Sequence, residues 1–470
     1  MKAKTLLINH LNPPGVDLFS GTGRCEPLNL AYLAAYLKAH HFPVEILDAE
    51  LLGYPANKVV KEIKKKQPDI VGLSAVTANF QKALDLAQKI KKLKNPPLTV
   101  IGGCHITALP AEMKNLPFFD FAVLGEGEKT LLELVKTISQ GKADFSQIKG
   151  LAFWQGKKLI FNPSRPYFKN LDQIPFPARE LLPPLSTYHP TPGMYRKRPM
   201  AFMITSRGCP YQCVFCSRAV FGNYYRARTA KNVVDEMELL IKDFGVKEIR
   251  VCDDLFSTDE KRVIEVCNEI TKRKLKLSWG CSARADLITK KMLLALKKAG
   301  CWEVIYGIES GSQEILNTIK KGLTLKTIKK TIKLTRESGL EARGYFMFGL
   351  PGDTEKTMQQ TIDLAKNLKL DLANFYITIP FPGTELWQKG DKFGKINKKG
   401  LMHYTNQTTA PPFIPHGLTG EKIIKYHQKA HQEFFLRPSF FISRLLKIKT
   451  LAQLKAAPMA LFSIARRFLK

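Results

Sequence analysis

Three cysteines fall within eight positions of one another, in the stretch Thr205-Ser-Arg-Gly-Cys-Pro-Tyr-Gln-Cys-Val-Phe-Cys-Ser-Arg218. The spacing C-x3-C-x2-C of Cys209, Cys213 and Cys216 lets one loop direct three thiolates towards one point. Thiolates are ligands for zinc and for iron–sulfur clusters. Structural zinc uses four ligands, and the next cysteine, Cys252, stands alone on a predicted strand. The stretch therefore predicts an iron–sulfur cluster with one iron open to another molecule.

The elements that must position this loop are alternating strands and helices. Six such units follow one another in residues 199–390, which predicts a partial barrel of parallel strands. Sites in that architecture gather at the carboxyl ends of the strands. Strands are predicted at 202–205, 248–252, 277–281, 303–307, 342–348 and 372–377, and helices at 231–244, 259–272, 290–299, 313–319, 325–338 and 354–367.

A second alternating series occupies residues 1–140 and predicts a doubly wound parallel sheet. Ligands of such sheets bind at the carboxyl ends of the strands, near the point where the strand order reverses. Strands are predicted at 5–9, 44–47, 70–74, 98–102 and 121–124, and helices at 28–39, 56–66, 78–93 and 129–139.

Two further regions have a different composition. Residues 141–198 contain eight prolines and are predicted to be a connector. Residues 391–470 are predicted to be a helical C-terminal extension. Its last part, 437–470, has eight Lys or Arg and no Asp or Glu, with apolar residues at helical spacing. Such an amphipathic segment fits peripheral contact with a membrane or packing on the protein's own body.

Bulk composition narrows the cellular setting. No run reaches the 18 uncharged apolar residues of a membrane span, and the first apolar run is too short for a signal peptide. The nine cysteines argue against a disulfide framework. We therefore expect a cytoplasmic protein, at most peripheral to the inner face of the membrane. The net charge of +32 fits either anionic partners or a solvated lysine-rich surface, and no specific nucleic acid is expected.

The cysteine stretch resembles the signature of the radical S-adenosylmethionine (SAM) superfamily, C-x3-C-x-aromatic-C, with Phe215 at the aromatic position. The resemblance implies that Cys209, Cys213 and Cys216 hold a [4Fe-4S] cluster whose open iron chelates SAM. It also implies reductive cleavage of SAM to a 5'-deoxyadenosyl radical, which abstracts hydrogen from a substrate. An electron donor such as flavodoxin or ferredoxin is then expected.

Downstream stretches resemble the SAM-contacting parts of the same superfamily. Glu309, in Tyr306-Gly-Ile-Glu-Ser-Gly-Ser312, matches the ribose-binding strand, and Phe348 with Gly349 matches the adenine-contacting strand and turn. Arg284, after a predicted strand, is a candidate for the methionyl carboxylate. A surface salt bridge is the alternative for Arg284.

Two carboxylates, Asp253 and Asp254, end the predicted strand 248–252. Their position faces the expected site, so they are candidates for substrate binding. Capping of the following helix is an equal alternative, since Asp is a favoured cap.

The first domain resembles the flavodoxin-like (Rossmann-like) cobalamin-binding domain that precedes the radical domain in one superfamily branch. By this resemblance Ser74, Gly102 and Gly103 line the nucleotide tail of cobalamin, where small residues leave room. His10 stands near the place of the cobalt-ligating histidine, but the D-x-H-x-x-G motif is absent. A cofactor-free domain of the same fold is the alternative. The resemblance rests on residues 26–37, 69–75, 101–105 and 123–128.

These features lead to three functional hypotheses. The first is a cobalamin-dependent radical methyltransferase acting on an unactivated carbon of a lipid, isoprenoid or other small natural product. The second keeps the radical chemistry without methyl transfer, as a cyclisation, rearrangement or oxidation. The third is a non-catalytic cobalamin- or nucleic-acid-binding regulator. A tRNA methylthiotransferase is rejected, because that group carries three cysteines in the first domain and this chain has only Cys25 and Cys104 there.

Overall fold

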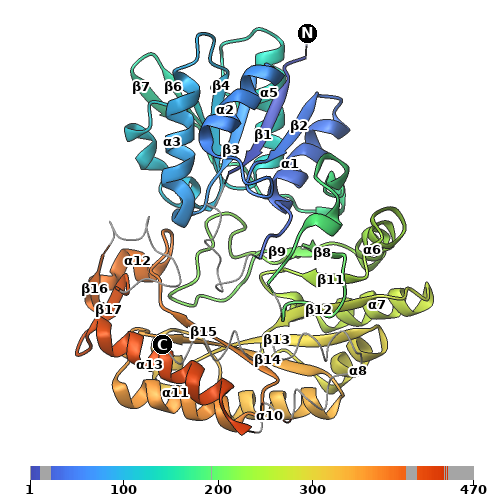
Figure 1. Ribbon diagram of the computed structural model, residues 1–470, viewed down its shortest axis with the longest axis vertical. Coiled ribbons are helices and arrows are strands. Elements are labelled where there is room, and N and C mark those ends of the chain that lie inside the picture. The colour runs from blue at the N-terminus through green and yellow to red at the C-terminus, as the bar shows by residue number, and fades with distance from the viewer. Residues whose placement is uncertain are drawn as a thin grey trace.

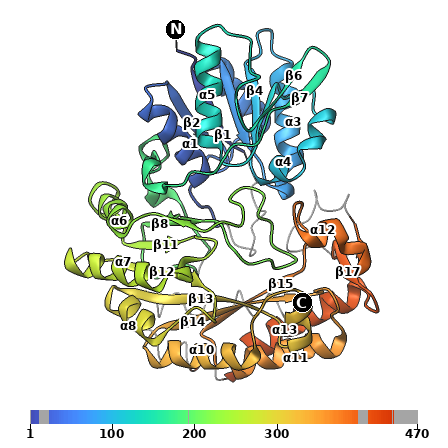
Figure 2. The ribbon, with the colours of Figure 1, turned by 180° about the vertical axis from the view of Figure 1, so that it is seen from behind.

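Two β-sheets, each built mainly of parallel strands, lie one above the other; helices cover both faces of the upper sheet and the outer face of the lower one (Figures 1 and 2). The computed structural model describes residues 2–10, 23–191, 193–397, 410–438, 440 and 442. The carboxyl ends of the strands in the upper sheet point towards the lower domain. The predicted α/β fold, with a Rossmann-like sheet followed by a six-stranded partial barrel and a helical C-terminal part, is confirmed.

The first sheet has seven strands in the order β2-β1-β3-β4-β5-β6-β7, of which β1 to β5 are parallel. Side chains alternate along β1, because successive strand residues point to opposite faces. Leu6 and Ile8 pack towards α2 and α3, and Leu7 packs towards α1 and α5. Helices therefore cover both faces, as a doubly wound sheet requires. The elements are β1 (Thr5–Asn9), α1 (Leu28–Ala39), β2 (Val44–Asp48), α2 (Ala56–Lys66), β3 (Ile70–Ser74), α3 (Phe80–Lys91), β4 (Leu98–Gly102), α4 (Cys104–Ala108), β5 (Phe121–Val123) and α5 (Gly127–Ser139).

The first sheet continues beyond residue 140. Strands β6 (Leu151–Gln155) and β7 (Lys158–Phe161) form an antiparallel hairpin that pairs with β5. Gly156 adopts φ +59° in the two-residue turn between them, a conformation that tight hairpin turns need. The prediction placed these residues in the connector because the prolines that follow them dominate the local composition.

The second sheet has six parallel strands in the order β15-β14-β13-β12-β11-β8. Each of the first five strands is followed along the chain by a helix on the outer face, and the sheet curls into part of a barrel (Figure 2). The elements are β8 (Met200–Met203), α6 (Ala230–Phe244), β11 (Glu248–Val251), α7 (Glu260–Lys272), β12 (Ser278–Ala283), α8 (Lys290–Lys298), β13 (Cys301–Glu309), α9 (Gln313–Thr318), α10 (Leu325–Glu337), β14 (Glu341–Phe348), α11 (Glu355–Asn367) and β15 (Leu372–Ile377).

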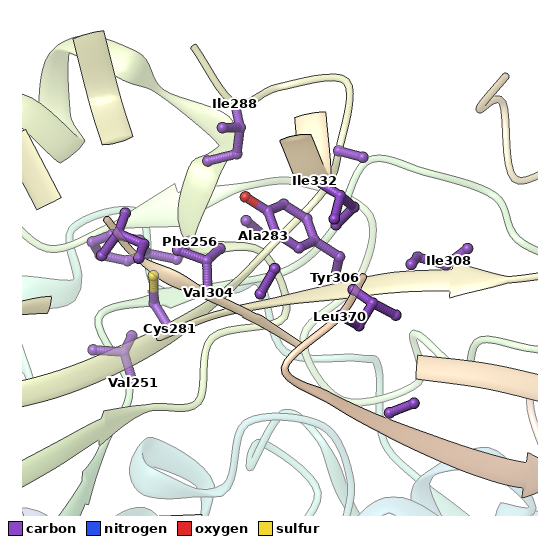
Figure 3. Close-up of a cluster of buried hydrophobic side chains, with 14 of the residues drawn as sticks. Val251, Phe256, Cys281, Ala283, Ile288, Val304, Tyr306, Ile308, Ile332 and Leu370 are labelled. Atoms are coloured by element: carbon purple, nitrogen blue, oxygen red, sulfur yellow. The ribbon is translucent and has the colours of Figure 1, made fainter. Parts of the chain in front are cut away.

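The barrel core lies between the strands and their helices. Figure 3 shows Val251, Cys281, Val304 and Tyr306 from three neighbouring strands directed into one cluster, together with Ile332 from α10. All five side chains are essentially inaccessible to solvent. The alternate residues of these strands face the concave side and are free to form a site.

The C-terminal part packs beside the last barrel strand. It contains α12 (Glu385–Lys389), β16 (Gly394–Ile396), β17 (Phe413–Pro415) and α13 (Gly420–Phe435), and α13 contacts α11 and β15. Arg437 donates hydrogen bonds to the carbonyls of Lys366 and Leu370. Most of the predicted basic segment 437–470 lies outside the described residues. Within the described ranges, no helix combines the length and apolar character of a bilayer span.

Candidate active site and cofactor cradle

The three cysteines lie on a loop between two short paired strands, β9 (Ser206–Arg207) and β10 (Arg226–Ala227). We call residues 208–225 the cluster loop. Gly208 begins it at φ +85°, and a Cβ there would lie 2.3 Å from the Tyr224 carbonyl oxygen, so only glycine fits. The Cys209 amide donates to the Gly222 carbonyl at 3.4 Å, which closes the loop on itself.

The middle of the cluster loop is held by the barrel. The Val214 amide donates to the carbonyl of Ile319, after α9, at 3.1 Å. The Val214 carbonyl accepts a hydrogen bond from the amide of Leu386 in α12, at 2.9 Å. Val214 itself is buried. Two elements of the second domain therefore fix the backbone between Cys213 and Cys216.

The thiol environment suits a thiolate-bound cluster. All three cysteines are free thiols. A hydrogen bond from the Cys216 thiol, with further help from Lys321, outweighs burial and lowers the pKa of Cys213 to about 6. The same bond raises the pKa of Cys216, and burial raises that of Cys209. Loading a metal cluster must therefore displace protons from Cys209 and Cys216, and three soft donors on one short loop fit an iron–sulfur cluster.

Glu309, the predicted ribose ligand, ends β13 beside this loop. It is buried and adopts φ +68°, an uncommon conformation for a residue with a side chain. Lys321 donates to Glu309 Oε1 at 2.7 Å, and its Nζ lies 5.9 Å from the ring centre of Phe215. Burial alone would lower the pKa of Lys321, but the Glu309 carboxylate holds it above its usual value. Nothing in the local pattern singles out Lys321, which follows α9 in an ordinary lysine pair.

Arg284 is also part of this site and is buried, so the alternative of a surface salt bridge is wrong. Its guanidinium lies 3.6 Å above the ring of Tyr211 in the cluster loop. It also bonds the Lys321 carbonyl and pairs with Asp286 at 2.8 Å. Arg284 therefore links the loop to the segment that carries Lys321. Its contact with a methionyl carboxylate stays a prediction.

The two adjacent carboxylates have different environments. Asp253 accepts hydrogen bonds from the Thr205 amide (2.5 Å), the Thr205 hydroxyl (2.6 Å) and the Ser206 hydroxyl (2.6 Å), so it braces the connection from β8 to β9. Asp254 accepts from the Gly208 amide at 3.0 Å and remains accessible to solvent. The protein that surrounds this carboxylate in the interior between the domains keeps bulk water away from it and raises the pKa of Asp254. Neither caps α7, whose N-cap is Asp259, so the capping alternative is wrong.

The Phe348–Gly349 turn, predicted to contact adenine, packs against β15 and α13. The Phe348 ring is fully buried, 6.0 Å from the ring centre of Phe375 and 6.3 Å from that of His427 in α13. Gly349 turns the chain at φ +73°, with Ile423 of α13 close behind it. The Phe348 ring is therefore part of the core, and its carbonyl accepts hydrogen bonds from the Thr378 amide and hydroxyl. The contact of this turn with adenine stays a prediction.

A cavity of about 390 Å³ opens at the carboxyl end of the first sheet. The predicted cobalamin residues Ser74, Gly102 and Gly103 all line it. Gly103 adopts φ +103°, and a Cβ there would lie 2.4 Å from the Ala75 carbonyl oxygen. Asn29 of α1 donates to the Ser74 hydroxyl at 2.8 Å. Small residues thus leave a space between sheet and helices that fits the tail of a corrinoid.

The opposite wall of this cavity belongs to the second domain. Ile204 and Arg207 line it from the strand region, and Val220 and Phe221 line it from the cluster loop. The cavity for the predicted corrinoid tail and the loop for the cluster are therefore one continuous structure.

Two histidines lie near the first sheet's edge without lining the cavity. His10 follows β1, and burial, followed by the charge of Lys82, lowers its pKa. Its role as a cobalt ligand stays a prediction. His105 is buried, and its ring bonds Thr77 (3.1 Å) and Glu112 (2.9 Å). His105 is therefore engaged in local structure.

Buried ion pairs join the two domains directly beside the cluster loop. Glu126 and Glu128, at the start of α5, accept hydrogen bonds from Arg207 at 2.9 and 2.6 Å. Glu126 also binds Arg226 at 2.9 Å. We call these four side chains the interdomain latch; each is at most 6% exposed. Arg207 and Arg226 are cross-strand partners in β9 and β10, so the latch holds both ends of the cluster loop.

A second buried network lies behind the latch. Arg179 of the connector binds Glu236 of α6 at 2.8 Å and approaches Glu26, before α1, at 3.4 Å. Glu26 also accepts from the Phe202 amide at 2.9 Å, and Arg228 completes the network through Glu236. The stretches 26–37 and 123–128, noticed for their resemblance to cobalamin domains, thus supply carboxylates that fasten the domains together.

Comparisons with known proteins agree with this architecture. The family model for the radical SAM superfamily matches residues 203–365, and that for the B12 binding domain matches residues 16–135. The chain therefore belongs to the cobalamin-binding radical SAM superfamily. An uncharacterized methyltransferase of Pyrococcus horikoshii is 36% identical over 425 residues, 90% of this chain and 90% of that protein.

Other relatives include both methyl-transferring and ring-forming enzymes. The anaerobic magnesium-protoporphyrin IX monomethyl ester cyclase of Rubrivivax gelatinosus is 34% identical over 426 residues, 89% of this chain and 75% of that protein. The fold matches that of the radical SAM methyltransferase TsrM of Kitasatospora setae, solved with cobalamin and a [4Fe-4S] cluster, with a TM-score of 0.71 and 21% identity over 93% of this chain and 90% of that one. The chain is a radical SAM enzyme, and the predicted cofactors, a [4Fe-4S] cluster, SAM and cobalamin, are confirmed.

Proposed function

We propose that the protein is a cobalamin-dependent methyltransferase that methylates an unactivated carbon of a polar natural product. The observation that carries this proposal is the shared cavity, which has Ser74 and Gly102 on one wall and Phe221 of the cluster loop on the other. Methyl transfer to an unreactive carbon needs a radical former and a methyl donor close together. A corrinoid site that opens directly onto the cluster loop meets this need.

The bound cofactors supply the reactive groups: the reduced cluster with SAM supplies the radical that removes a hydrogen atom, and methylcobalamin supplies the methyl group. Cys209, Cys213 and Cys216 would hold the cluster. Glu309 would accept hydrogen bonds from the ribose hydroxyls, while Lys321 holds that carboxylate in place through its hydrogen bond to Oε1.

The first domain would hold the corrinoid mainly through shape. Ser74, Gly102 and Gly103 would flank the nucleotide tail, and the cluster loop would cover it from the other side. Water would be excluded by the apolar part of the same wall, including Val220 and Phe221. His10 remains a candidate for the lower ligand of cobalt.

The substrate class is inferred from the concave side of the second sheet. Asp254 and Cys252 are accessible there, at the end of β11, and partial desolvation in this interior raises the pKa of Cys252 to about 12. Tyr345 of β14 is half-buried, with its ring 5.5 Å from that of Tyr376. A purely hydrocarbon substrate would desolvate these polar groups without replacing their hydrogen bonds. Their presence supports a substrate with hydroxyl, amide or similar groups.

A ring-forming radical reaction is the second candidate, because a cyclase is among the relatives with more than 30% identity. Such a reaction would use the same cluster loop and the same Glu309–Lys321 pair. It differs in leaving no methyl group on the product.

The test is an anaerobic incubation of the reconstituted protein with methyl-labelled SAM. Polar metabolite and lipid extracts would be offered separately. Label in a polar product supports the proposal, and label only in lipids overturns the substrate class. Formation of 5'-deoxyadenosine with an unlabelled product would reject methyl transfer and favour the ring-forming alternative.

A further inference from the structure

A basic pocket of about 370 Å³ lies on the surface where α5 meets the connector. We define the basic pocket by Lys129, Lys149, Arg165 and Lys169, which line it together with Tyr167. Arg165 is paired with Glu133. The three lysines form no ion pair within the described part of the chain, and Lys149 and Lys169 are exposed. The pocket therefore carries an excess of uncompensated positive charge.

One lining residue of the basic pocket, Tyr167, touches the cluster loop. A Cβ on Gly222 would lie 2.7 Å from the Tyr167 ring, so the ring is packed directly against the loop backbone. The guanidinium of Arg226, which belongs to the latch, lies 4.7 Å from the centre of the same Tyr167 ring. The Gly222 carbonyl accepts the hydrogen bond from the Cys209 amide at 3.4 Å. Tyr167 and Gly222 thus form a short bridge from the surface to a cluster ligand.

We propose that the basic pocket is the docking surface for a small acidic protein that delivers one electron to the cluster. The inference rests on the proposed function, because cleavage of SAM requires a reduced cluster. One electron leaves the partner's flavin or iron–sulfur centre, which is oxidised, and enters the cluster, which is reduced; no bond forms or breaks. Opposite charges speed such encounters and fix their orientation, and the bridge makes this face a short route to Cys209.

The test uses the exposed residues, whose replacement leaves the core intact. The double variant Lys149→Glu/Lys169→Glu is compared with Lys64→Glu/Lys65→Glu on α2, which makes the same charge change at two exposed lysines on the other face of the first sheet. The probe is reduced flavodoxin, an acidic one-electron donor. Its dissociation constant and association rate are measured by titration and stopped flow at several salt concentrations.

We expect the pocket variant to bind flavodoxin about tenfold more weakly, with a flatter salt dependence, and the α2 variant to bind as wild type does. Both variants should cleave SAM at the wild-type rate when dithionite replaces flavodoxin. Equal weakening in both variants, or wild-type binding by the pocket variant, would overturn the docking proposal.

The dithionite reaction separates this inference from the proposed function. A wild-type protein that fails to cleave SAM with dithionite would reject the radical function itself, while the flavodoxin titration would still report on the surface. The variant Tyr167→Leu provides a second check, because it keeps every charge of the basic pocket. It should retain flavodoxin affinity and lower the rate of flavodoxin-driven cluster reduction several-fold, and an unchanged rate would exclude the Tyr167 bridge.

Discussion

The carboxyl ends of the two sheets face the same interior region but differ in the side chains they present: the first has glycines, and the second has charged and polar groups. The first sheet makes its cavity by omitting side chains, at Gly102 and Gly103. The second sheet fills its edge with charged and polar groups, including the Glu309–Lys321 pair and Asp254. The first edge can admit a large group by shape, whereas the second can orient a small charged one. Each edge should therefore fail under a different kind of substitution.

The largest effect is expected at the cluster loop. Replacing Cys213 with Ala removes the thiol with the lowered pKa and one of three cluster ligands, so iron content and SAM cleavage should fall to background. Corrinoid binding should persist, because the cavity is lined by other residues. Iron analysis, absorption spectra and assays of 5'-deoxyadenosine check this. A protein that keeps its cluster and its activity would contradict the assignment of the site.

Adding bulk should disable the first edge alone. The substitution Gly102→Val extends two methyl groups into the cavity and should weaken corrinoid retention by at least about tenfold, with normal cluster content. Gly102→Ala is the matched control, since its Cβ would lie 3.6 Å from the nearest atom, an ordinary contact. Equilibrium titration with hydroxocobalamin compares them. Equal retention by both variants would mean that the tail lies elsewhere.

Removing charge should weaken the second edge alone. The substitution Glu309→Gln keeps the shape but removes the negative charge beside Lys321, so SAM affinity should fall about tenfold. Unfolding free energy should also fall, by about 3 kcal/mol, because Lys321 is left as a buried cation without its counter-ion. Glu314→Gln, on the exposed side of α9, is the control. Equilibrium binding of SAM and denaturant unfolding measure the two effects.

The latch tests whether the two edges work as one site. The substitution Glu126→Gln should leave each cofactor bound but loosen the cluster loop, so the ratio of 5'-deoxyadenosine to methylated product should rise several-fold. Glu133→Gln on the same helix is the control, because its ion pair with Arg165 is partly exposed and contributes little. An unchanged ratio for Glu126→Gln would show that the latch serves stability only.

Local pattern was enough for most of the fold and for the covalent part of the site. The parallel strands of both sheets follow from apolar runs of strand length, and the cysteine loop follows from spacing alone, whereas the antiparallel hairpin β6–β7 was missed beside the proline-rich stretch. The latch could not be predicted, because its partners are 79 and 100 residues apart in sequence and belong to different domains. Lys321 was missed for a similar reason: its partner Glu309 is twelve residues away across a helix. Charges acquire their roles from neighbours that only the tertiary structure supplies.

The shared carboxylate Glu126 has a consequence for how such proteins can be recombined. It sits on the first domain, yet it satisfies two arginines that bracket the loop on the second. A chimera that joined this radical domain to a corrinoid domain lacking acids at positions 126 and 128 would bury two cations unpaired. Neither domain can therefore be exchanged by itself. A working chimera must keep all four latch residues, so that the acids of the first domain still meet the arginines of the second.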